Sequence, residues 1–332
     1  MARPRSSSVP PSVSHAPFMA LAPARRSTSV ARTSRLSGLF ARAFAGAAFR
    51  AKRACTAMSK TSQSKQLLLA GGIGGPLTIG LYTPLRNAIT LGAKDAATSA
   101  WSLYRLAFAQ GLAGGWTGWR APTAFSCPQF LAIGPLYHLY SGVVGPSLAI
   151  IPTALTESTI SYGSQARNAQ MAYNVTVDAS KRVALQRPWD PRGIGLPAHI
   201  MRNACAMSGI RSLTHPVELA LTSSAATLHV PLDARSTKTV ADFVSSIMAA
   251  AISMPFNQLF NFLAITPAAA RQNGIIASCA AFLESQYLAR SPSGGVQLSR
   301  TLLRDMFMRC LYIAPQLSTY SAIERLCVSR CQ

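Results

Sequence analysis

The sequence predicts an all-α membrane protein with six transmembrane helices in three pseudo-repeats, and short surface helices between the members of each pair. Of the 332 residues, 49% are hydrophobic and 13% are charged, which is about half the charged share of an ordinary soluble domain. The mean hydropathy is positive. Beyond residue 65 the chain contains six apolar segments that each reach the ~20 residues needed to cross a bilayer.

The first 65 residues are basic and contain no acidic residue. Twelve of the 32 basic residues lie here, and the first acid of the chain is Asp95. Residues 32–54 interleave Leu and Phe with arginines, in the pattern of an amphipathic helix. Such an Arg- and Ser-rich segment is typical of a mitochondrial transit peptide. The alternative is a disordered basic tail that binds RNA or anionic lipid. Because the charge is concentrated here, we expect no nucleic-acid partner for the rest of the chain.

Each apolar segment is expected to form one membrane helix. These segments cover residues 66–91, 122–143, 145–169, 196–222, 241–269 and 297–326. Two amphipathic stretches, 94–110 and 274–288, are expected to lie along the membrane surface. The predicted organisation is a basic N-terminus (1–65), repeats at 66–143, 144–222 and 239–326, a linker at 223–238 and a tail at 327–332.

Segment 110–137 has the most specific motif. In order, it contains Gly111, Trp116, Gly118, Pro122, Thr123 and Pro128. This spacing resembles the junction between a surface helix and the second transmembrane helix of the mitochondrial carrier family. The resemblance implies the carrier fold and a multi-pass location in the inner mitochondrial membrane. It also implies transport of a small metabolite by alternating access around a central site. The family's basic residue before the second glycine is replaced by Thr117.

The resemblance assigns structural roles to several glycines and prolines. The glycines of the first helix are expected to let helices approach closely, and the prolines are expected to bend or shape the helices. The residues concerned are Gly71, Gly75, Pro84, Gly118, Pro128 and Pro255.

Carriers close both sides of the membrane with ion pairs, and this chain has lost most of those charges. On the matrix side the three acidic positions of the odd helices are occupied by Arg86, Glu157 and Asn257. Arg86 reverses the expected sign, so an Arg86–Glu157 pair across the bundle is one expectation. On the opposite side the gate remnants are His138, His215 and Glu218.

The resemblance places substrate contacts midway along the even helices. These positions are Phe125, Arg202 and Arg304, with Arg309 as the alternative register in the last helix. A charged side chain inside a membrane is a functional hypothesis, and here it points to an anionic solute. The alternative is that the arginines pair with Asp305 or Glu218, or extend to lipid headgroups.

The expected function is therefore metabolite transport, with inner-membrane lipid, including anionic lipid, and a small solute as partners. The loss of gate charges favours a second hypothesis, a transport-incompetent structural subunit or scaffold of an inner-membrane complex. A third is an outer-membrane carrier-like protein acting in membrane dynamics or protein insertion. Seven dispersed cysteines and five histidines match no metal-ligand spacing. The glycine run 71–75 lacks the acidic residue of a dinucleotide-binding motif. No enzyme activity, cofactor or metal is expected.

Overall fold

A computed structural model describes residues 70–228, 233–290 and 295–329 of the chain. The described residues all belong to one compact unit. The expected transit peptide, residues 1–65, lies outside the described residues. The described part is all-α apart from one two-stranded hairpin, which confirms the all-α part of the predicted fold class.

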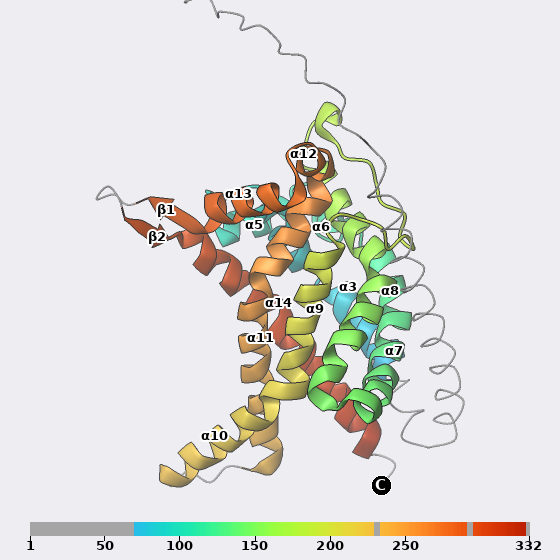
Figure 1. The fold of residues 1–332 in the computed structure, drawn as a ribbon, viewed down its shortest axis with the longest axis vertical. Coiled ribbons are helices and arrows are strands. Elements are labelled where there is room, and N and C mark those ends of the chain that lie inside the picture. The colour runs from blue at the N-terminus through green and yellow to red at the C-terminus, as the bar shows by residue number, and fades with distance from the viewer. Residues whose placement is uncertain (1–69, 229–232, 291–294, 330–332) are drawn as a thin grey trace, which may run out of the picture. The chain divides into compact units, whose positions relative to one another are not determined.

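The helices follow one another along the chain, with a long connection between α8 and α9 that contains only the short turn η2 (Figure 1). Their bounds are η1 Ala70–Gly74, α3 Gly75–Leu81, α4 Thr83–Gly92, α5 Ala100–Ala107, α6 Leu112–Gly115, α7 Arg120–Val144, α8 Pro146–Asn174, η2 Ala179–Lys181, α9 Leu196–Ser208, η3 Gly209–Leu213, α10 Thr214–Thr227, α11 Ala234–Ile265, α12 Pro267–Gln272, α13 Ile275–Tyr287 and α14 Arg300–Ser329. The strands are β1 Leu288–Arg290 and β2 Val296–Leu298. Of these, η1 and η3 are π-helical turns and η2 is a 3-10 turn.

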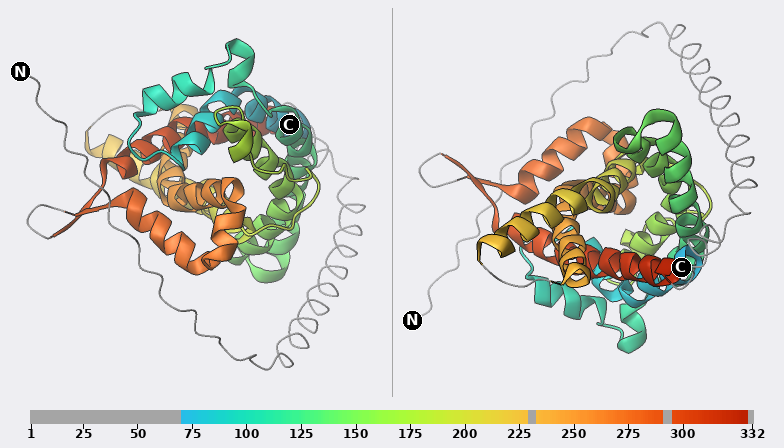
Figure 2. Two further views of the ribbon diagram at one scale, coloured as in Figure 1. Left: turned by 90° about the horizontal axis from the view of Figure 1, so that it is seen from above. Right: turned by 90° about the horizontal axis from the view of Figure 1, so that it is seen from below.

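The long helices pack against their neighbours in chain order and close into a ring (Figure 2). The contacting pairs are α3 with α7, α7 with α8, α8 with α9, α9 with α11, α11 with α14, and α14 with α3 and α4. Helix α10 continues α9 beyond η3 and packs mainly against α11. Because the last helix returns to the first, the ring has an inner face that every member can line.

Prolines affect these helices differently according to their position. Pro84 lies in the first turn of α4, directly after the break at Tyr82 that separates α4 from α3. Proline is tolerated there because its missing N–H has no helical partner in a first turn. Pro128 and Pro255 lie inside α7 and α11, which continue through them.

Three boundaries differ from those expected. The surface stretch 274–288 ends in the β1–β2 hairpin, in which Leu288 pairs with Leu298 in antiparallel register. The last helix therefore begins at Arg300 instead of 297. The predicted linker 223–238 is mostly helical where it is described, because α10 runs to Thr227 and α11 begins at Ala234. Asp233 caps that start by accepting from the Ser236 amide at 3.0 Å, a local signal that the sequence carries.

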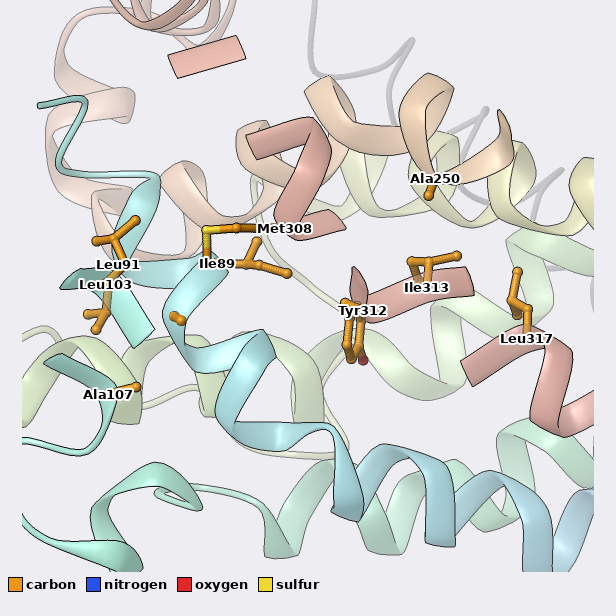
Figure 3. Close-up of a cluster of buried hydrophobic side chains, with 10 residues drawn as sticks. Ile89, Leu91, Leu103, Ala107, Ala250, Met308, Tyr312, Ile313 and Leu317 are labelled. Carbon is orange, nitrogen blue, oxygen red and sulfur yellow. The ribbon is translucent and has the colours of Figure 1, made fainter. Parts of the chain in front are cut away.

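The apolar core is divided into separate clusters between helix pairs. One cluster joins α4, α5, α11 and α14, and its Leu103 and Met308 are fully buried; Leu103 lies beside Leu91 (Figure 3). A second lies between α3, α7 and α8 around Phe130, and a third around Tyr162 and Phe260. Much of the remaining buried surface is polar.

The outward faces of the ring are apolar. On α3 with η1, and again on α14, exposed large apolar side chains recur every four residues and so form one stripe on each helix. The stripes are Ile73, Leu77 and Leu81, and Leu303, Phe307 and Leu311. Helix α11 exposes a similar set. Among the described residues, one helix, Ser236–Ile265, is long and apolar enough to cross a membrane.

Candidate functional site

A cavity lies on the inner face of the ring. It is lined from α3, α7, α8, α9, η3 and α14, and its volume is about 80 Å³. Its apolar lining residues are Ile79, Phe130, Ile133, Ala206, Met207, Ile313 and Leu317. The polar residues that decide its chemistry are Gln129, Glu157, Gln165, Arg202, Asn203, Arg211, Arg309, Tyr312 and Gln316.

Glu157 is the acidic residue in the cavity lining. Its Oε1 accepts a hydrogen bond of 2.6 Å from Nε2 of Gln129, which joins α8 to the neighbouring α7. Its Oε2 has no hydrogen-bond partner among the described residues. The second oxygen of this buried side chain is therefore able to accept a further bond.

Arg202 and Arg309 are buried and approach the cavity from α9 and α14. Nε of Arg202 donates to Oδ1 of the adjacent Asn203 at 3.0 Å, and its guanidinium lies 5.0 Å from the Phe260 ring centroid. Nε of Arg309 donates to Oγ of Ser253 at 3.4 Å. Within the described residues neither arginine has a carboxylate within 4 Å, so both charges rely on neutral partners.

An aromatic cluster lies next to Arg202, toward the end of the ring where α9 begins. Tyr162, His199 and Phe260 contact one another through their rings, with centroid distances of 4.8 to 5.9 Å. His199 is fully buried, and one of its ring nitrogens lies 3.0 Å from Oγ of Ser161. Rings from α8, α9 and α11 thus pack together at this end of the ring.

The expected Arg86–Glu157 pair does not form. Nη1 of Arg86 donates instead to Oε1 of Gln165 at 3.3 Å, and Glu157 is held by Gln129. Arg86 and Glu157 are therefore each hydrogen-bonded to a glutamine instead of paired with each other. Asn257, the third residue of the expected matrix-side gate, is buried on α11.

Arg304 lies away from the cavity, at the start of α14. It forms an ion pair of 2.8 Å with Asp305. Its Nη2 donates to the Gly92 carbonyl at 3.0 Å, and its Nη1 to those of Asp95 and Thr98 at 2.6 and 2.7 Å. It therefore ties the last helix to the carboxyl end of α4. The sequence left Arg304 and Arg309 as alternatives for the substrate contact of the last helix, and Arg309 is the one that lines the cavity.

The other predicted contact and gate residues are not among the cavity-lining side chains. Phe125 is partly buried on α7, and the residue of that helix that does line the cavity is Gln129, one turn further along. His138 on α7 and His215 on α10 are exposed, and Glu218 on α10 is partly exposed. Gln129 and Gln165 were not predicted from the sequence, because the expected site residues were chosen mainly by their charge and glutamine is neutral.

The glycines of the first helix lie where α3 and η1 approach α7. A Cβ on Gly71 would lie 2.5 Å from the Phe130 carbonyl oxygen, and one on Gly75 would lie 2.4 Å from the Phe130 ring. At these distances any larger residue would push the helices apart.

The junction at 115–118 is held by two buried asparagines that the sequence pattern did not single out. Nδ2 of Asn87 and Nδ2 of Asn168 each donate to the Thr117 carbonyl at 3.0 Å. Gly118 has a φ of 76° and lies against Asn168. A left-handed backbone in such close contact requires glycine.

No family model and no curated protein sequence matches this chain. The functional assignment therefore depends on the residues and their geometry.

Proposed function

We propose that this chain is a carrier-like inner-membrane protein of mitochondria, which moves a small anionic metabolite by alternating access around the central cavity. The observation that carries the proposal is the inverted distribution of polarity. Exposed apolar side chains run along α3, α11 and α14, whereas Arg202, Arg309 and Glu157 are buried and line the cavity. Lipid is the solvent that such an exterior suits, and buried charges inside a membrane bundle mark a solute pathway.

Six membrane helices were expected, and among the described residues one helix is by itself long and apolar enough to cross a membrane. A helix that lines a polar cavity carries polar residues on its inner face, which lowers its mean hydropathy although its outer face is apolar. The break at Tyr82 also divides the first helix into two pieces, and each piece is too short to cross a membrane alone. Neighbouring helices can satisfy backbone groups at such breaks inside a membrane.

The transport test is uptake into proteoliposomes containing the purified chain. We expect exchange of a small carboxylate or phosphate that is lost in Arg202→Ala and retained in Arg105→Ala, an exposed arginine on α5. Equal uptake by wild type and Arg202→Ala would contradict a central role for this residue. Import of the chain into isolated mitochondria, with and without residues 1–65, tests the proposed address.

The second candidate is a structural subunit or scaffold that no longer transports. Within the described part of the chain Arg86 and Glu157 form no ion pair, which favours the scaffold, because a charge-paired gate stabilises the closed state of a carrier yet opens reversibly. The aromatic cluster around His199 is the feature that favours transport instead, as an apolar closure. Stoichiometric co-purification with an inner-membrane assembly, together with no uptake of any solute, would favour the scaffold.

A further inference from the structure

A second cavity, called here the side cavity, lies at the end of the ring where α12 and α13 follow α11 (Figure 1). Its volume is about 380 Å³, against about 80 Å³ for the central cavity, and small-molecule sites commonly measure about 300–1,000 Å³. The two cavities have no lining residue in common. The side cavity is lined by Ala93, Lys94, Phe262, Ile265, Thr266, Ala269, Ala270, Asn273, Ser278, Ala281, Phe282, Ser285 and Gln286.

One of these lining residues, Lys94, is charged. It follows the carboxyl end of α4 and is exposed. Its Nζ donates to the hydroxyl of Tyr173 and lies 4.3 Å from the centroid of that ring. Within the described residues Lys94 has no carboxylate within 4 Å. A cation that is held in place by a neutral aromatic residue can still pair with an anionic group, so the side cavity is suited to a ligand with one negative charge.

Two phenylalanines provide the aromatic part of the wall. Phe262 on α11 and Phe282 on α13 are stacked, with ring centroids 4.5 Å apart and an angle of 21° between the ring planes. Ile265 and the alanines of α12 and α13 extend this apolar surface. An aromatic ligand packs against such rings with a gain beyond the area that it buries. The wall therefore fits an aromatic ring better than an aliphatic one of the same size.

A buried amide in the lining lacks a hydrogen-bond partner. Gln286, in the last turn of α13, is 8% exposed. Its Oε1 has no hydrogen-bond partner among the described residues. Leaving a buried acceptor unsatisfied costs free energy, and a ligand hydroxyl that donates to it would remove this cost. Ser278 on the same helix adds a second buried polar group to the lining.

We propose that the side cavity binds a small aromatic monocarboxylate that carries a hydroxyl group. Lys94 pairs with the carboxylate, Phe262 and Phe282 contact the ring, and Gln286 accepts from the hydroxyl. The site goes beyond the proposed function, because it lies apart from the central cavity and its occupancy can be measured without any transport.

The test uses 4-hydroxybenzoate and three probes that each lack one of its features. Benzoate lacks the hydroxyl, 4-methylphenol lacks the charge, and 4-hydroxycyclohexanecarboxylate lacks the aromatic ring. Kd values come from ligand-observed NMR titrations of the purified chain in detergent, with protein-free micelles subtracted. We expect wild type to bind each of the three about threefold or more weakly than 4-hydroxybenzoate. A wild-type protein that binds all four equally, or none, overturns the site.

Two variants assign the features to residues. Gln286→Leu should bind 4-hydroxybenzoate and benzoate alike, and Lys94→Gln should bind 4-hydroxybenzoate and 4-methylphenol alike. A merely structural role would weaken all four probes by one factor and leave their ratios unchanged, which would overturn the assignment. Lys238→Gln removes an exposed charge near the start of α11, the end of that helix away from Phe262, and should change no Kd.

Two further variants locate the bound ligand. Ala281→Trp fills the side cavity and should raise the Kd of 4-hydroxybenzoate at least about tenfold, whereas Arg202→Ala, in the central cavity, should leave it unchanged. The opposite result would place the ligand in the central cavity and overturn the proposal. Uptake measured on the same preparation separates the two proposals. Binding with these preferences but no uptake of any solute supports the side cavity and contradicts transport alone.

Discussion

At the scale of single residues, the neighbours of an arginine decide its role. Arg304 and Arg309 are five positions apart on α14, yet one ties the ring closed and the other lines the cavity. Arg304 meets carbonyl groups at the carboxyl end of α4, where the helix dipole favours a cation. Its ion-pair partner Asp305 also accepts from the Tyr287 hydroxyl at 3.2 Å, so the carboxylate is held from two elements.

Removing the Arg304 guanidinium should destabilise the whole ring. Arg304→Met leaves the buried Asp305 carboxylate without its cation, and breaking a buried pair in this way costs about 3–5 kcal/mol. Thermal unfolding in detergent checks this result. Arg300→Met, an exposed position one turn earlier on the same helix, is the matched control and should change the stability by less than about 0.5 kcal/mol. Similar stability changes in both variants would show that the contacts of Arg304 contribute little to the stability of the ring.

At the scale of elements, close helix packing depends on where a glycine faces. Gly75 faces Phe130 across the α3–α7 contact, whereas a Cβ on Gly142 in α7 would meet nothing within 4 Å. Both glycines lie in helices, so their intrinsic conformational cost is comparable. The difference between them is therefore due to packing.

Alanine at these two positions should have opposite effects. Gly75→Ala forces the Phe130 ring or α3 to move, and overpacking of this kind costs about 1–3 kcal/mol. Gly142→Ala should be neutral or stabilising by up to about 1 kcal/mol, because alanine is the better helix former. Thermal unfolding of the two variants in the same detergent gives the comparison. A stabilised Gly75→Ala protein would contradict the α3–α7 contact described above.

The elements also show how far sequence patterns reach. The asparagine cap at the 115–118 junction comes from Asn87 and Asn168, which are 81 residues apart. No local pattern connects these two side chains, although the glycine that they surround was recognised. The junction was identified from residues that lie close together in the sequence. Asn87 and Asn168 were missed because they come from other helices.

At the scale of the whole molecule, the ring separates a polar interior from an apolar exterior. This arrangement is the reverse of that expected for a soluble helical bundle, in which the exposed faces are polar. The effect of a new charge on an exposed side chain should therefore depend on whether that side chain belongs to the apolar exterior of the ring. Leu77 on α3 and Trp101 on α5 are both well exposed, at 60% and 67%, but only Leu77 belongs to an apolar stripe of the ring.

A lysine should therefore be tolerated at one of these positions and not at the other. Leu77→Lys places a charge at a proposed lipid-facing site, where insertion costs about 2.5–3.5 kcal/mol near a helix centre. Trp101→Lys lies on a surface helix and should have a small effect. The fraction of chain that resists alkaline extraction from membranes measures insertion. Equal fractions for both variants would argue against lipid on the outside of the ring.

The sequence alone determined the helical class, the approximate extents of the long helices and the glycines of the first helix, because apolar periodicity and backbone freedom are local properties. The tertiary structure decided which polar residues meet. Arg304 and Arg309 point about 140° apart around one helix axis, and only the packing of α14 against α11 and α4 turns Arg309 inward. The same packing places Gln165 beside Arg86 and Gln129 beside Glu157. The charges of the site can be read from the sequence, but their partners depend on contacts between distant helices.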